Sequence, residues 1–275
     1  MYNSSMKIVA GVVSPREAEY FSEFAEELYF GVPQVENHRK WYANQQFAST
    51  AEVKTAVRAA HAVGRRILLA ANEIYRPAAY AGVLASIRRL LDLGVDGLIV
   101  RDLFLLDHFT SREPGPKLVL SSTAGCFNAE AARFYARFRL ARIVVPQHVL
   151  PAEFSPVLRQ VRGPAYEIFY FPDCFCPNVD GVCPLHDINK TESPRNCTAP
   201  HALAGRSWRM PKPPWAARLE MIRDYYRLGV RHIKMPRDGT FEEKRSVLRS
   251  VLRISEALRA GVSRKEFLRR ASEEA

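Results

Sequence analysis

Short apolar segments alternate with longer amphipathic segments along most of the chain, and this alternation restricts the fold more than any other feature. Eight segments have the length and nearly continuous apolar character of buried parallel strands. They cover residues 7–13, 27–31, 65–71, 96–100, 117–122, 142–146, 165–171 and 231–235. Because helical patterns separate most of them, we expect a (β/α)8 barrel of the TIM type, with a doubly wound open sheet as the alternative.

Local signals mark where helices begin and end. Capping boxes open four helices, at Ser14, Ser49, Thr240 and Ser263. Further helices are expected over about 77–93, 129–138 and 214–227. Residues 93–102 and 228–238 share the order Leu-Gly-Val, strand, Arg-Asp, and the glycine of each suits a helix end in the left-handed conformation. We found no GxGxxG or GxxxxGK[ST] motif after a strand, so a Rossmann or P-loop nucleotide site is not expected.

The domain organisation follows from this pattern. We interpret residues 1–275 as one barrel domain, with a Cys-rich loop insertion over 172–214 and C-terminal helices over 240–275. The start of the chain lacks the features of an export signal, and no apolar run is long enough for a membrane span. We therefore expect a cytoplasmic protein, in which disulfides rarely persist.

The Cys-rich loop raises the question of what its thiols do. It carries Cys174, Cys176, Cys183 and Cys197, with His186 and His201 as possible substitute ligands. The paired CxxC knuckles of zinc sites do not occur, whereas iron–sulfur clusters tolerate irregular spacing. A zinc site, a reactive thiol and four unconnected buried thiols stay open as alternatives. Cys126 lies apart, after the fifth strand, and we interpret it as a packing residue.

Polar side chains stand at the carboxyl ends of several expected strands. A barrel places its chemistry at this end, and Arg and Lys there suit an anionic substrate such as a dicarboxylate. The candidate substrate-binding residues are Asn72, Arg101, Asp102, Asn128, Gln147, Lys234 and Arg237. For any one of them, capping or pairing within the barrel is the simpler explanation; the convergence of the set carries the prediction.

A Glu-x-Phe motif, Glu167-Ile168-Phe169, precedes a Cys-x4-Gly-x-Cys-x-Leu pattern formed by Cys176, Gly181 and Cys183. This order resembles the signature of the proteins known as peptidase family U32, which is similar to Glu-x-Phe followed by Cys-x4-Gly-x-Cys-x-aliphatic-Ser. Three departures stand out. One extra residue lies before Cys176, Pro172-Asp173 replaces a Gly-small pair, and His186 replaces the final Ser. Further landmarks, among them "ELYFG", "SSTAGCFN" and "LGVRHIKMPRD", resemble the family over residues 7 to about 258.

This resemblance implies an iron–sulfur protein more than a protease. Several members act in O2-independent hydroxylation, either of ubiquinone precursors, as a heterodimer of two U32 proteins, or of tRNA and rRNA bases. It implies a 4Fe-4S cluster on Cys176, Cys183 and Cys197. Cys174 is our choice for the fourth ligand, and His201 is the alternative. Prephenate is the implied oxygen donor.

Two other functions remain open at this stage. A U32-type, collagenase-like peptidase would need an activated nucleophile; the chain has no HExxH or GxSxG motif, although Cys126 or Cys183 could pair with a histidine. A non-catalytic, metal-bearing partner subunit is the other alternative, because the Glu-Gly and Arg-Glu landmarks of the family are missing. The net charge of +11 is compatible with RNA, but much of the excess lies on the C-terminal helices, so a small anionic or aromatic substrate is preferred.

Overall fold

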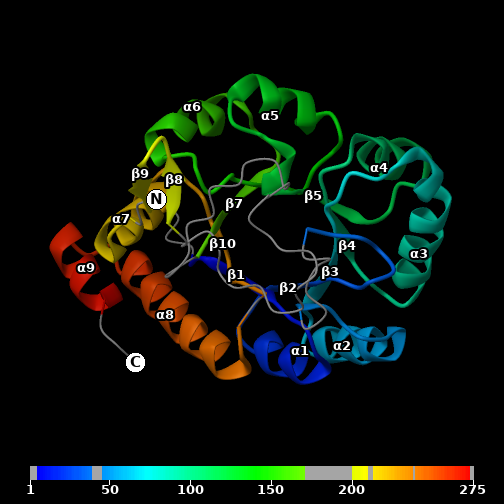
Figure 1. The fold of residues 1–275 in the computed structure, drawn as a ribbon. Coiled ribbons are helices and arrows are strands. Elements are labelled where there is room, and N and C mark those ends of the chain that lie inside the picture. Colours follow the sequence, from blue (N-terminus) through cyan, green and yellow to red (C-terminus); the bar gives the residue numbers. More distant parts are fainter. Residues whose placement is uncertain (1–4, 39–44, 171–199, 210–212, 238, 273–275) are drawn as a thin grey trace.

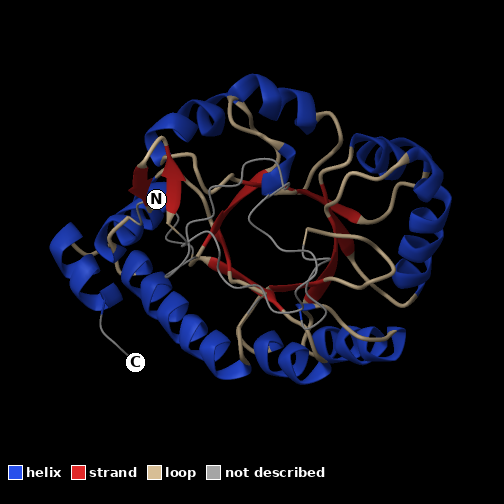
Figure 2. Cartoon of the chain, in the orientation of Figure 1, coloured by secondary structure: helices blue, strands red, loops and turns tan. Residues whose placement is uncertain are grey.

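The computed structural model describes residues 5–38, 45–170, 200–209, 213–237 and 239–272. Its centre is a closed barrel of eight parallel strands in the order β1-β10-β7-β6-β5-β4-β3-β2. A ring of helices surrounds the strands, and Figures 1 and 2 show this arrangement from one end of the barrel. Closure of the sheet confirms the predicted (β/α)8 barrel and rejects the doubly wound alternative.

All eight predicted strands are present, each one or two residues shorter than predicted. Those of the barrel are β1 (Lys7–Gly11), β2 (Glu27–Phe30), β3 (Arg66–Ala71), β4 (Gly97–Val100), β5 (Lys117–Leu120), β6 (Arg142–Val144), β7 (Ala165–Phe169) and β10 (His232–Lys234). A separate antiparallel hairpin, β8 (His201–Leu203) and β9 (Arg206–Trp208), lies in the connection that follows β7.

The helices confirm most of the sequence prediction. They are α1 (Pro15–Ser22), α2 (Thr50–Ala62), α3 (Tyr80–Asp92), α4 (Leu103–Asp107), α5 (Ala129–Ala136), α6 (Pro151–Gln160), α7 (Trp215–Arg227), α8 (Phe241–Arg259) and α9 (Arg264–Ser272). Two were not predicted. The helix α4 is short, and α6 contains Pro156, which interrupts a helical sequence pattern. In the described part of the chain, no helix is long and apolar enough to span a membrane.

The predicted helix ends form as expected. The side chains of Ser14, Ser49 and Thr240 each accept a hydrogen bond from a backbone N–H three residues later, at 3.3 Å. The glycines of the two Leu-Gly-Val repeats, Gly94 and Gly229, adopt φ values of 98° and 102°. Only glycine enters this left-handed region without strain, which explains the repeated pattern.

Two separate apolar clusters hold the barrel together. The larger one lies between the strands and the helices that surround them. The smaller one fills the barrel itself, where inward-facing residues stack in layers of four from alternate strands. By strand register, the two central layers are Val9, Leu68, Val119 and Glu167, and Tyr29, Ile99, Val144 and Lys234. The first layer therefore contains three aliphatic residues and the acidic Glu167. The second contains two aliphatic residues, the aromatic Tyr29 and the basic Lys234.

Arg142 connects these charges to the amino-terminal end of the barrel. Its guanidinium forms ion pairs with Glu27 on β2 and with Glu167 on β7, the latter at 2.5 Å, and all three side chains are at most 2% exposed. Glu167 also accepts a hydrogen bond from Lys234 Nζ at 3.0 Å. The same ammonium lies 3.7 Å from the ring centre of Tyr29. The side chains of Glu27, Arg142, Glu167 and Lys234 thus form a continuous charge column in the barrel core.

The pKa values of the acids and of Lys234 in this column depend on the charged groups beside them. Burial would raise the pKa of the Glu27 carboxyl, but the charge and hydrogen bond of Arg142 outweigh it and lower that pKa. Burial also works against ionised Glu167, and Arg142 and Lys234 together lower its pKa. For Lys234, burial is the largest influence and lowers the pKa, with partial compensation from Glu167. Both carboxylates stay ionised because cations stand beside them.

We expect Arg142→Met to destabilise the fold by about 3–5 kcal/mol, because it leaves two buried carboxylates without their shared partner. Urea unfolding at neutral pH measures this. Arg66→Met is the matched control: Arg66 Nε also contacts Glu27, at 3.5 Å, but its side chain is 52% exposed, so the loss should stay below about 1 kcal/mol. Equal losses in the two variants would contradict the role given to Arg142.

His232 on β10 gives a pH prediction. Burial, helped by the charge of Arg142, lowers its pKa from 6.5 to about 4. Between these values the unfolded chain binds a proton that the folded chain does not, so stability falls as pH falls through this window. We expect His232→Gln to flatten the fall, by up to about 1.4 kcal/mol per pH unit. Chemical unfolding at a series of pH values tests it; parallel curves for the two proteins would refute it.

Candidate functional site at the barrel mouth

The carboxyl ends of the strands form the mouth of the barrel, and four predicted site residues gather around it. Arg101 follows β4, Arg237 follows β10, Asn72 follows β3, and Gln147 follows β6 by three residues. Arg101 and Arg237 are 9% and 3% exposed, and the other two are half-buried. Two buried guanidinium groups therefore lie at this end of the barrel.

The position of Arg237 is set by close packing. A Cβ at Gly11 would lie 2.6 Å from the Arg237 Cα, so the chain after β10 can cross the end of β1 only because this residue is glycine. The Arg237 guanidinium donates to Asn37 Oδ1 at 2.8 Å, and Asn37 Nδ2 donates to Gln46 Oε1 at 2.8 Å. Gly31 leaves the room that these side chains occupy.

Asn72 joins three connections at the mouth. Its Oδ1 accepts a hydrogen bond from the His38 backbone N–H at 3.1 Å, and its Nδ2 donates to Ser121 Oγ at 3.3 Å. The loops after β2, β3 and β5 therefore meet at this one side chain. The Asn72 amide therefore holds these loops together and is also a polar group of the mouth.

The other three predicted residues have intramolecular roles. Asp102 caps α4 through the Leu105 N–H at 3.0 Å and also accepts from Tyr80 Oη, at 3.0 Å. Asn128 is exposed and caps α5. Lys234 is directed into the barrel core toward Glu167 rather than toward the mouth. The structure therefore does not group these three with the residues of the mouth.

Cys126 behaves as the packing residue that the sequence indicated. Its side chain is fully buried in the apolar cluster between strands and helices. Burial raises the pKa of its thiol to about 12, so the thiolate needed for nucleophilic attack or metal binding is scarce at neutral pH.

The predicted metal ligands Cys174, Cys176, Cys183 and Cys197 lie outside the described residues. The alternative ligand, His201, is the first residue of β8. Within the described ranges, no group of three or more His, Cys, Asp or Glu side chains could hold a metal ion.

Several residues around the mouth and core were not predicted as site residues. Glu167 was detectable, because it is a lone charge within an apolar strand segment, whereas Glu27 follows Glu26 at the start of its segment and gave a weaker signal; both are buried. Asn37 and Gln46 carried no such signal. They belong to the long connection between β2 and α2. Only the folded chain brings Asn37 to Arg237, and Gln46 bonds to Asn37.

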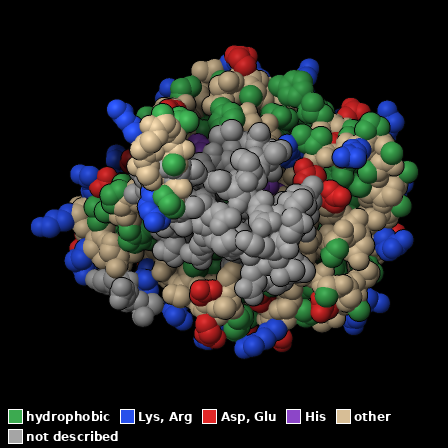
Figure 3. Space-filling model, viewed as in Figure 1, with side chains coloured by type: hydrophobic (Ala, Val, Ile, Leu, Met, Phe, Trp, Pro, Cys, Tyr) green, Lys and Arg blue, Asp and Glu red, His purple; other side chains and the backbone are tan. Residues whose placement is uncertain are grey.

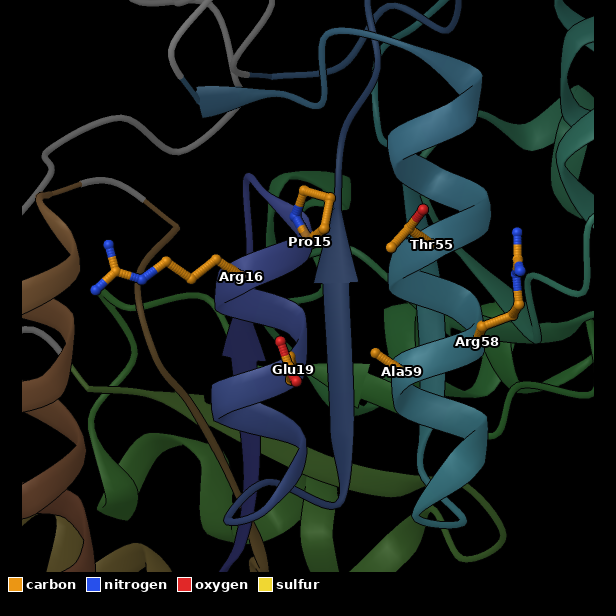
Figure 4. Close-up of a pocket in the computed structure, with 6 residues that line it drawn as sticks. All are labelled: Pro15, Arg16, Glu19, Thr55, Arg58 and Ala59. Carbon is orange, nitrogen blue, oxygen red and sulfur yellow. The ribbon is translucent and has the colours of Figure 1, made fainter.

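A shallow groove on the outer surface can be compared with the mouth as a candidate binding site. It lies between α1 and α2, lined by Pro15, Arg16, Glu19, Thr55, Arg58 and Ala59. Figure 4 shows the Arg16 and Arg58 side chains pointing away from each other. Arg16 instead lies over the Phe241 ring, 4.3 Å from its centre. The groove lacks convergent polar groups, so the mouth is the better candidate site.

Comparison with known proteins agrees with the sequence resemblance. The model of peptidase family U32 matches residues 17–204. The tRNA hydroxylation protein P of Escherichia coli (strain K12) is 22% identical over 182 residues, which is 66% of this chain and 39% of that protein. The chain therefore spans about two fifths of the length of this relative.

Solved structures support the fold alone, because their sequences are distant. A U32 peptidase matches with a TM-score of 0.52 and 19% identity, over 60% of this chain and 69% of its own. A tryptophan synthase α-subunit from Pyrococcus furiosus matches with a TM-score of 0.52 and 15% identity, over 100% and 98% of the two chains. The family match covers more than half of the sequence, and the chain belongs to peptidase family U32.

Proposed function

We propose that this chain is an iron–sulfur protein that takes part in O2-independent hydroxylation of an aromatic or nucleobase substrate. One observation carries the proposal: a U32 chain with a tRNA hydroxylation protein among its relatives has four cysteines in the connection that follows β7. That connection leaves the carboxyl end of a barrel strand, where TIM-type enzymes place their chemistry.

The donor set fits a 4Fe-4S cluster on Cys174, Cys176, Cys183 and Cys197, with His201 as the alternative to Cys174. Four thiolates are the usual ligands of such a cluster. The chain has five cysteines, and the buried, weakly acidic Cys126 is a poor ligand, so the other four form the natural set. When bound, the cluster would supply one-electron redox chemistry.

The mouth suits an anionic ligand. Guanidinium groups bind carboxylates well, and this end of the barrel carries those of Arg101 and Arg237. We propose that prephenate, a dicarboxylate, is the oxygen donor bound there, and that Asn72 and Gln147 supply neutral hydrogen bonds. In this arrangement Lys234 lies deeper in the barrel than the ligand. It belongs to the charge column of the core and does not contact the ligand.

A peptidase is the less favoured function. The buried Cys126 lacks the thiolate character of a nucleophile, which leaves Cys183 as the cysteine for a Cys–His pair. We assign that thiol to the cluster instead. A heterodimer with another U32 protein, in which this chain is the cluster-bearing subunit, is a variant of the same proposal. Product formed by the purified chain alone would separate the active enzyme from the subunit.

Anaerobically purified protein should contain about four iron and four sulfide per chain and show a broad absorbance near roughly 400 nm. Cys183→Ala should lose most of this iron, because one iron of the cluster loses its thiolate. Cys126→Ala is the matched control and should keep full iron content. Stoichiometric zinc in a colourless protein, or full iron in Cys183→Ala, would overturn the ligand assignment.

Gly11→Ala should weaken prephenate binding about tenfold or more, ~1.4 kcal/mol, because the new methyl group displaces the backbone of Arg237. Calorimetric titration measures the affinity. Gly82→Ala in α3 is the control, since its Cβ would meet nothing within 4 Å. That variant should keep the affinity and gain up to about 1 kcal/mol of stability. Unchanged binding in Gly11→Ala would remove Arg237 from the ligand site.

A further inference from the structure

A buried ion pair that does not belong to the charge column lies at the seam where the barrel closes. Lys244 Nζ is 2.8 Å from Glu17 Oε2, and the two side chains are 1% and 6% exposed. Glu17 belongs to the first turn of α1, and Lys244 belongs to the first turn of α8. Because β1 and β10 pair as neighbours, the helices that follow them also meet, and Figure 1 shows α1 beside α8.

Both members of this pair hold the carboxyl end of β1. Glu17 Oε2 accepts a hydrogen bond from the Val13 backbone N–H at 2.9 Å, and Lys244 Nζ donates to the Gly11 carbonyl at 3.5 Å. The backbone of Arg237 crosses this same point, since a Cβ on Gly11 would lie 2.6 Å from the Arg237 Cα. The pair therefore fixes the stretch of backbone against which Arg237 packs.

Arg237 belongs to a connection that is joined to β1 on both sides. Before it, the Met235 N–H donates to the Val9 carbonyl at 2.8 Å, which continues the pairing of β10 with β1. After it, α8 begins at the capping box of Thr240, and Lys244 lies within the first turn of that helix. The contact of Lys244 with the end of β1 thus holds the second side of the connection.

The energetics of a buried ion pair favour a positioning role over a stabilising one. Moving a carboxylate and an ammonium out of water costs free energy that their attraction only roughly repays, so the net gain in stability is small. The geometry, in contrast, is well defined, because the hydrogen bonds between buried charges weaken if either group moves. Figure 3 shows many Lys and Arg side chains at the periphery, where water screens their charges, whereas Lys244 is buried.

We propose that Glu17 and Lys244 are positioning residues for Arg237, because they hold the end of β1 so that the Arg237 guanidinium keeps its place at the mouth. This inference rests on the proposed function, since the ligand that Arg237 would meet there is the proposed dicarboxylate. Neither member of the pair contacts that ligand. Their effect reaches it through the backbone at Gly11.

The test uses the double variant Glu17→Gln/Lys244→Met in the anaerobically purified full chain. Glutamine keeps an acceptor for the Val13 N–H, and both charges of the pair are removed together, so the melting temperature should change little. Amide hydrogen exchange of the peptide that contains Met235 and Arg237 should become faster, because the backbone there is held less firmly. The affinity for prephenate, measured by calorimetric titration, should fall about tenfold, as expected for the loss of one charge-assisted hydrogen bond.

A second variant covers the case in which the double variant does not fold. Glu17→Asp keeps both charges and withdraws the carboxylate by one methylene group, so it should still speed the exchange and weaken prephenate binding. A folded variant that keeps both the exchange rates and the affinity of the unchanged protein would overturn the inference. Faster exchange with unchanged affinity would overturn it as well.

Arg245→Met is the matched control. Arg245 is the next residue of α8, and its Nε donates to Tyr20 Oη of α1 at 3.2 Å, so it links the same two helices to each other. This variant should leave both measurements unchanged, and changes equal to those of the double variant would contradict the role given to the pair. If the unchanged protein does not bind prephenate, the proposed ligand is wrong, and the exchange rates alone decide whether the pair positions Arg237.

Discussion

The buried guanidinium of Arg142 is the interaction on which the barrel core depends. It pairs with carboxylates from β2 and β7, two strands that are not neighbours of each other, and it does so where water is excluded. An unpaired charge at that depth costs several kcal/mol, so the three strands are held in one relative position. Glu167 extends the constraint to Lys234 on β10, and Tyr29 closes it by donating to the Met235 carbonyl at 2.9 Å. The segment that carries Arg237 begins immediately after these contacts.

The sequence predicted the strands and most helices because their signals are local. Apolar strand segments, capping residues and the glycines after two helices each act within a few residues, and each formed as expected. The helix α6 was missed because Pro156 hides its periodicity, and α4 because it is only five residues long. The closed sheet was predictable as a class from the number of β/α units, whereas register and layer composition became known only from the pairing of strands.

Site residues were harder to predict, because residue type and position along the chain do not fix the direction of a side chain. Asp102 and Arg101 are adjacent, yet the first caps a helix and the second stays at the mouth. Lys234 lies at a strand end but reaches back into the core, since Glu167 offers a partner there. The loop residues Asn37 and Gln46 could not be found at all, because Asn37 meets Arg237 across 200 positions of sequence and Gln46 contacts Asn37.

The buried charges of the barrel core balance one another. Arg142 and Lys234 are buried and contact the two buried carboxylates, Glu27 and Glu167. Arg66 and Lys117 also contact Glu27, but their side chains are 52% and 26% exposed, and they open β3 and β5 at the amino-terminal end of the barrel, away from the mouth. Water screens these two charges, so they add little at the carboxyl end. The attraction of the mouth for the proposed dicarboxylate therefore depends on Arg101 and Arg237, which lie at that end.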